Sequence, residues 1–127
     1  MGRPRTIEID DLDILRGIER VTTATVESLR AESAEFEKRS NEAHGPIRFT
    51  WSRHQWVCDE EIKHISQYGV EYDIPAFFGR EPSSTERIRI QQAIRRMDDA
   101  GDVEIFGKRA ARVRITEQGR KRVENGD

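Results

Sequence analysis

The chain has 127 residues, of which 36% are charged and 35% hydrophobic, and its formal net charge is −2. This length leaves room for one domain with an extension, and so few apolar residues predict a small core that a partner would help to complete. The single cysteine excludes an intrachain disulfide and is typical of a reducing compartment. Because we find neither a membrane-spanning apolar run nor the apolar segment of a signal peptide, we expect a cytoplasmic protein with no membrane partner.

Residues 1–9 are predicted to form a flexible basic arm. The opening MGRPRT contains Gly-Arg-Pro, the centre of an AT-hook, in which an extended arginine-containing segment enters a narrow minor groove. Arg3 and Arg5 are therefore candidate contacts to a DNA backbone. A plain disordered tail is the alternative interpretation, because short basic starts are common.

A long helix is predicted over residues 10–39, because the stretch lacks proline and Asp10 or Asp11 can cap its start. With the linker up to residue 44, it is a possible dimerisation element. Polar side chains occupy three of the seven positions in its stripe, which consists of Leu15, Ile18, Thr22, Thr25, Leu29, Glu32 and Phe36. The helix therefore packs on its own domain or on a symmetry mate. In the second case, the candidate dimer contacts are Leu15, Ile18, Leu29 and Phe36.

A break is predicted at residues 40–50, where Asn, Gly and Pro occur together, and we place a domain boundary there. Residues 46–49 are a candidate short strand. A second helix is predicted over 51–68, with Ser52 and Gln55 at the spacing of a capping box.

The connection that follows contains one more short helix. Residues 69–72 are predicted to turn, and Asp73 is predicted to cap a helix that ends at Gly79. Phe77 or Phe78 is expected to pack on the apolar face of the next helix, since both lie on this short element.

The clearest helix is predicted over residues 84–100. Ser83 and Glu86 have the spacing of a capping box, and Gly101 is a typical C-terminal cap. At about 100° per residue, one face of this helix is apolar and is the face expected to be buried. It consists of Ile90, Ala93, Ile94 and Met97.

The opposite face and its flanks carry the side chains that point to nucleic acid. Arginine and glutamine can make paired hydrogen bonds with guanine and adenine edges in the major groove. The candidate base-reading residues are Ser84, Thr85, Ile88, Arg89, Gln91, Gln92, Arg95 and Arg96. An ordinary solvated face of an amphipathic helix is the alternative.

A β-hairpin is predicted over residues 103–116, because apolar and polar residues alternate on either side of a turn at Gly107. Thr116 is a candidate cap of a last short helix. Residues 84–122 carry a net charge of +5, whereas residues 1–83 carry −5. A basic end of this kind is expected of a phosphate-binding surface. The candidate backbone contacts are Lys108, Arg109, Arg112 and Arg114.

The order of helix, AGDV, hairpin and ITEQGR resembles the winged helix-turn-helix superfamily, especially its MarR-type and PadR-type regulators. The resemblance implies a mostly α fold with a small β-hairpin, in which a winged helix DNA-binding domain covers residues 45–127. It also implies a three-helix core, a recognition helix at roughly 84–100 and a wing at 103–116.

We expect no enzyme, no metal site and no cofactor. His54 and Cys58 are four residues apart, so a helix can present both to one ion, but no second close pair of ligands accompanies them. No Gly-rich phosphate loop and no Gly-x-Ser-x-Gly motif is found in the sequence.

Three functional hypotheses follow. The first is a sequence-specific double-stranded DNA-binding protein, acting as a homodimeric, repressor-like transcriptional regulator with recognition helices in successive major grooves. The second is a replication, partition or DNA-architecture factor with the same DNA-binding domain. The third is a winged-helix module that binds another protein, for which an apolar outward face is expected. The sequence does not indicate any small-molecule effector.

Overall fold

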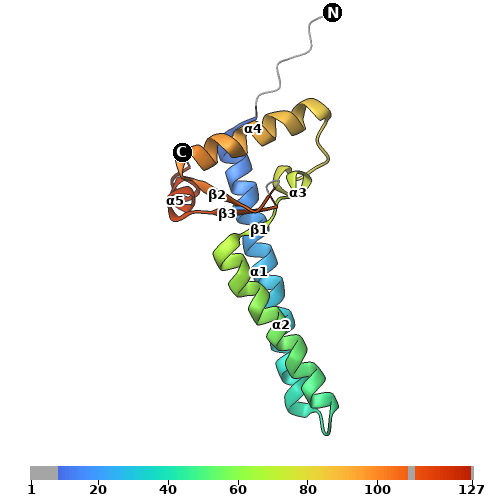
Figure 1. Ribbon diagram of the computed structural model, residues 1–127. Coiled ribbons are helices and arrows are strands. Elements are labelled where there is room, and N and C mark those ends of the chain that lie inside the picture. The colour runs from blue at the N-terminus through green and yellow to red at the C-terminus, as the bar shows by residue number, and fades with distance from the viewer. Residues whose placement is uncertain (1–8, 109–110, 127) are drawn as a thin grey trace, which may run out of the picture.

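The computed structural model describes residues 9–108 and 111–126, and the chain is mostly helical with one small antiparallel sheet (Figure 1). The mostly α class with a β-hairpin is therefore confirmed. The elements in chain order are α1 (Asp11–Glu42), α2 (Ile47–Tyr68), β1 (Val70–Glu71), α3 (Ile74–Phe78), α4 (Ser84–Ala100), β2 (Val103–Phe106), β3 (Arg112–Ile115) and α5 (Glu117–Asn125). Arg3, Arg5 and Arg109 lie outside the described residues.

The predicted long helix is confirmed as α1, which extends three residues beyond the expected end, to Glu42. The Asp10 side chain accepts a hydrogen bond from the backbone N–H of Leu12 at 3.0 Å, and Asp11 and Asp13 follow in the first turn. Negatively charged side chains interact favourably with the positive N-terminal end of the helix dipole, so these residues help to determine where α1 begins.

The start of the second helix was predicted wrongly. Residues 47–49 form the first turn of α2 and not a strand, because Pro46 already has a helical φ of −62° and leads directly into the helix. No side chain caps this end. Ser52, the expected cap, lies inside α2, where its hydroxyl is 2.7 Å from the hydroxyl of Ser40 in α1.

The hairpin β2–β3 is confirmed, and β1 adds a third strand that the sequence did not predict. The strand order is β1-β3-β2, with Val70 opposite Val113 and Val103 opposite Ile115. A two-residue strand is too short to show a period of two, so the sequence predicts only a turn at residues 69–72.

The three predicted short-range caps after α2 are also confirmed. Asp73 accepts from the N–H of Ala76 at 3.3 Å at the start of α3, and Thr116 accepts from Gly119 at 3.1 Å at the start of α5. The capping box of α4 is present, and it bears on the functional surface described below.

One core joins the start of α1 to all the elements after α2. We call this part the head; it comprises the first half of α1, the end of α2, and residues 70–108 and 111–126. Its buried apolar side chains are Leu12, Ile14, Leu15, Ile18, Ile65, Val70, Ile74, Phe77, Ile90, Ile94, Met97, Val103, Val113 and Ile115. The expected boundary at residues 40–50 therefore does not separate the start of α1 from the rest of the core.

The predicted dimer contacts on α1 lie within its own chain. Leu15 and Ile18 are 0% exposed in the core of the head, so no partner can reach them. Leu29 is half-buried and packs against the same core. Phe36 is half-buried and stacks on Trp51 of α2, with the ring centroids 6.0 Å apart. The stripe is thus an intramolecular seam, which is the alternative left open by its polar positions.

The far halves of α1 and α2 project from the head as an antiparallel pair of helices (Figure 1). We call residues 29–42 and 47–62 the arm. Small polar contacts hold its seam, including the hydrogen bond from Ser33 to Asp59 at 2.6 Å. Cys58 is buried there beside Glu32, and its pKa is raised by burial and by that carboxylate.

Gly17 lies where α1 crosses α3. A Cβ added at this position would be 1.9 Å from the backbone oxygen of Phe77. We expect Gly17→Ala to lower the free energy of unfolding by about 1–3 kcal/mol, measured by urea denaturation, because the backbones must separate. Thr23→Ala, on the exposed side of α1, should change it by no more than about 0.5 kcal/mol. Helix propensity alone predicts that Gly17→Ala stabilises by about 1 kcal/mol, and that result would contradict the packing.

Candidate nucleic-acid interface

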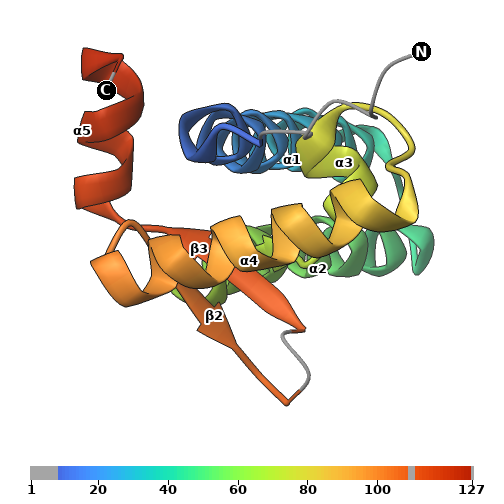
Figure 2. The same cartoon turned by 90° about the horizontal axis from the view of Figure 1, so that it is seen from above.

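α4 lies across the end of the head that is opposite to the arm (Figure 1). Seen from above in Figure 2, it is the element nearest the viewer and crosses over the sheet. One side of α4 therefore covers the core, and the other faces solvent, away from the arm.

The N-terminus of α4 is fixed by a dense set of hydrogen bonds. Ser83 accepts from the N–H of Glu86 at 3.1 Å, and the Glu86 carboxylate accepts from the N–H of Ser83 at 2.9 Å. The Arg80 guanidinium donates to the same carboxylate at 2.6 Å. The Arg80 guanidinium and the Ser83 N–H lower the pKa of Glu86 from 4.5 to about 2, against the opposing effect of burial.

The two faces of α4 are as the sequence predicted. Ile90, Ala93, Ile94 and Met97 are buried, and Gly101, with a φ of 89°, ends the helix in the left-handed conformation. All eight predicted base-reading residues are exposed. Seven of them form the outward face and its flanks, namely Ser84, Thr85, Ile88, Arg89, Gln91, Gln92 and Arg95. Neither Arg89 nor Arg95 forms an ion pair with a carboxylate of the described residues, so both guanidinium groups are available to a ligand.

Arg96, the eighth predicted base-reading residue, is held elsewhere. Its guanidinium donates to the Asp11 carboxylate at 2.7 and 3.3 Å, and this pairing raises the pKa of Arg96. This side chain joins α4 to the start of α1, and its role in base reading stays a prediction. Asp11 and Arg96 are 85 residues apart, so no local sequence pattern could indicate that they pair.

Two of the predicted wing contacts are also held within the head. Arg112 donates to the backbone oxygen of Gly69 at 2.9 Å and to the Glu61 carboxylate at 3.0 Å. Arg114 pairs with Glu104 on the neighbouring strand. Arg112 joins the hairpin to α2, and Arg114 joins β3 to β2. Their contacts to a DNA backbone stay predictions.

Lys108 is the one predicted wing cation of the described residues that stays exposed without a carboxylate partner. It lies in the turn after β2, next to Gly107.

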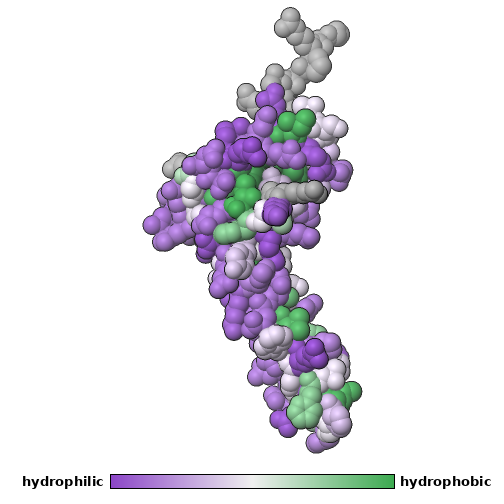
Figure 3. All heavy atoms as spheres, in the orientation of Figure 1, coloured by the Kyte–Doolittle hydropathy of each residue, from purple (hydrophilic) through white to green (hydrophobic). Residues whose placement is uncertain are grey.

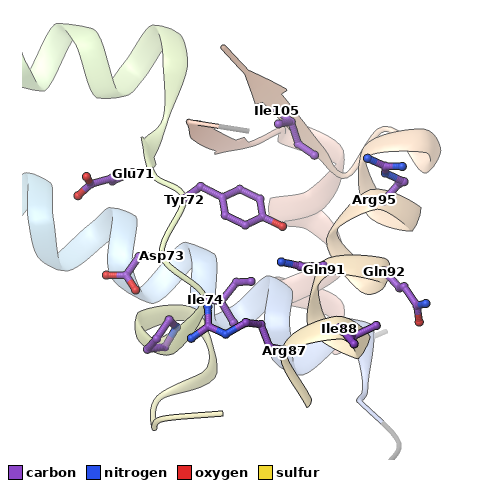
Figure 4. A pocket seen from close by; sticks show the side chains of 11 residues that line it. Glu71, Tyr72, Asp73, Ile74, Arg87, Ile88, Gln91, Gln92, Arg95 and Ile105 are labelled. Atoms are coloured by element: carbon purple, nitrogen blue, oxygen red, sulfur yellow. The ribbon is translucent and has the colours of Figure 1, made fainter. Parts of the chain in front are cut away.

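A cleft of about 850 Å³ runs along one flank of α4, between this helix, α3, β1 and β2. In Figure 4, the ring of Tyr72 points from the β1–α3 connection toward α4, where Gln91 lies, whereas Glu71 and Asp73 point away from it. Burial raises the pKa of the Tyr72 hydroxyl, and the positive charge of Arg95 opposes this rise. Sequence reasoning missed Tyr72, because nothing in its neighbours marks it as part of a surface formed with α4.

Comparisons with known protein families, with curated proteins and with solved structures found no match to the chain. Within the described residues, no three or more His, Cys, Asp or Glu side chains come together in a way that could hold a metal ion. Nor does any helix in residues 9–108 or 111–126 combine the length and apolar character needed to cross a membrane.

Acid should loosen the start of α4 through Glu86. In the unfolded chain this carboxyl is protonated near pH 4.5, whereas in the folded chain it stays ionised down to about pH 2. The unfolded state therefore binds more protons in this window, so the free energy of unfolding falls as the pH is lowered through it. Urea denaturation across this window should give a shallower pH dependence for Glu86→Gln than for the wild type. Glu81→Gln, an exposed neighbour, serves as the control, and equal slopes for Glu86→Gln and wild type would contradict the assignment.

Proposed function

We propose that the chain is a sequence-reading, double-stranded DNA-binding protein with a winged helix-turn-helix head. In this proposal α4 enters the major groove and the β2–β3 hairpin lies along the neighbouring backbone. The observation that carries the proposal is the outward face of α4, where amide, hydroxyl and unpaired guanidinium groups stand together at the tip of the head.

The order of elements supports the same assignment. Two helices, α3 and α4, are joined by a short connection and followed directly by an antiparallel hairpin, which is the order that the winged helix-turn-helix resemblance implies. The tight capping at Ser83 and the left-handed Gly101 give α4 defined ends. A helix with fixed ends and a rigid packed face can hold its outward side chains in one register on a duplex.

The pairing of the surrounding cations narrows the DNA contact to a few residues. Arg80, Arg87 and Arg96 are each paired with a carboxylate of the chain. We therefore assign base reading to Gln91, Gln92, Arg89 and Arg95, with Ser84 and Thr85 at the start of the helix. Lys108 is assigned to a phosphate, because it is an exposed cation in the turn after β2 with no carboxylate partner among the described residues.

The simplest role for such a head is regulation of transcription. Ile88 is the observation that favours the second candidate, a protein-docking helix, since its side chain is 55% exposed in the middle of the outward face. In the DNA-binding role, the same side chain contacts a thymine methyl group. The cationic and amide neighbours of Ile88 support the DNA-binding role, because the core of a protein interface is depleted of charge.

Substitutions on α4 test this proposal. Gln92→Ala and Arg95→Ala should each reduce the discrimination between a selected site and random DNA by about 1–3 kcal/mol, because each removes a paired base contact. Fluorescence anisotropy with both duplexes at fixed salt measures the difference. Arg30→Ala, an exposed cation on α1, is the charge-matched control and should leave discrimination unchanged.

An equal loss of affinity for both duplexes would show that these two side chains contact only the backbone. If neither substitution affects DNA binding, while circular dichroism shows the variants folded, α4 is not the reading helix. Ile88→Asp then tests the second candidate, the protein-docking helix, because a docking face would lose its partner through that change.

A further inference from the structure

The arm has several large apolar side chains on the outside. The fully buried residues of its seam are small, namely Ser33, Ser40 and Cys58, whereas the stacked Phe36 and Trp51 are half-buried. On α2, by contrast, Phe49 is 75% exposed and Trp56 is 61% exposed. In Figure 3, hydrophobic atoms gather toward the far end of the arm, below a mainly hydrophilic stretch. Large apolar side chains exposed together on one face indicate a surface that is covered in the functional state.

These side chains form a continuous stripe along α2. Phe49, Arg53, Trp56 and Glu60 follow at spacings of four, three and four residues, which places them on one helix face. Val57, 52% exposed, widens the stripe beside Trp56. We call these five residues the α2 stripe. It lies on the side of α2 away from Trp51 and Cys58, which contact α1.

We propose that the α2 stripe binds the α2 stripe of a second copy of the chain, with the two helices antiparallel. The charges in the stripe carry this choice. Arg53 precedes Trp56 and Glu60 follows it, so a two-fold axis next to Trp56 places Arg53 of each copy beside Glu60 of the other. The same axis brings Trp56 of one copy against Val57 of the other. The surface is thus complementary to itself, as a two-fold interface must be.

The alternative, a parallel pair, brings like charges together. It places Arg53 against Arg53 and Glu60 against Glu60, which costs energy in a contact that excludes water. Glu60 also contacts Lys63 of its own chain at 3.2 Å. That pair is exposed and weak, so it leaves Glu60 able to bind Arg53 of the other copy. Arg53 itself has no carboxylate partner among the described residues.

The antiparallel pairing has a consequence for DNA, which rests on the proposed function. Each head joins its arm near the middle of α1 and the end of α2, so antiparallel arms place the two heads at opposite ends of the dimer. The α2 helix has 22 residues and is about 33 Å long. Because α4 faces away from the arm, the two α4 helices of such a dimer face in opposite directions (Figure 1). One dimer therefore holds two separate duplex segments and does not place both helices on successive grooves of one site.

A charge exchange tests the interface without DNA. Sedimentation equilibrium of the full chain should show a dimer for the wild type, and Arg53→Glu or Glu60→Arg should each raise the dissociation constant about tenfold or more. The double variant R53E/E60R should return it to within about threefold of wild type, since the opposite charges meet again. Arg30→Glu, an equal charge change on α1, should have no effect.

A wild-type chain that stays monomeric would overturn the proposal and leave the α2 stripe to a partner of another kind. So would a dimer that both single variants preserve, because a parallel pair or another surface would then hold it. Trp56→Ser gives a second test of the apolar centre, and it should also yield a monomer with unchanged helical circular dichroism.

Duplex capture then tests the opposed heads. Beads carrying one duplex should recover a second, fluorescent duplex with wild type and with R53E/E60R, but not with Arg53→Glu, which should still bind the beads. A charge-dependent dimer that binds DNA without joining two duplexes would overturn the opposed arrangement. A charge-dependent dimer that binds no DNA at all would keep the α2 interface and reject the proposed function, so the two failures are distinguishable.

Discussion

The packing of α4 on the start of α1 is the constraint on which the rest of the molecule depends. Ile90, Ile94 and Met97 are buried together with Leu15 and Ile18, and the ion pair between Arg96 and Asp11 closes one edge of this contact. Burial of that face determines which side of α4 remains for a ligand. It also explains why α1 cannot serve as a dimer helix along its first half, since those side chains are already used to support α4.

The local features of the fold could be predicted from the sequence, because their causes lie within a few residues. The caps at Asp73, Ser83 and Thr116 and the two faces of α4 depend on spacing alone, and the structure contains each of them. The start of α2 and strand β1 could not be predicted in this way. At the start of α2, Pro46 leads into the helix without a side-chain cap, so no capping residue marks the first turn. Strand β1 has only two residues and exists by pairing with β3, far away in the chain.

The candidate site shows the same division. Exposure of Gln92 and Arg95 follows from helix periodicity, whereas the roles of Arg96, Arg112 and Arg114 depend on which carboxylates the fold brings near them. A cation in a basic segment is therefore a stronger candidate for a nucleic-acid contact when the folded chain leaves it unpaired. The same reasoning applies to the arm, where Phe49 and Trp56 become informative because α1 packs against the other side of α2.

Selection of random duplex DNA on the purified chain is the measurement that tests the central claim most directly. The account predicts that a short sequence is enriched, and that Arg95→Ala selects a relaxed version of it at one or two positions, because α4 reads bases with that side chain. A folded wild-type chain that enriches no sequence, or an Arg95→Ala variant that enriches an unchanged one, would contradict the assignment of α4 as the reading helix.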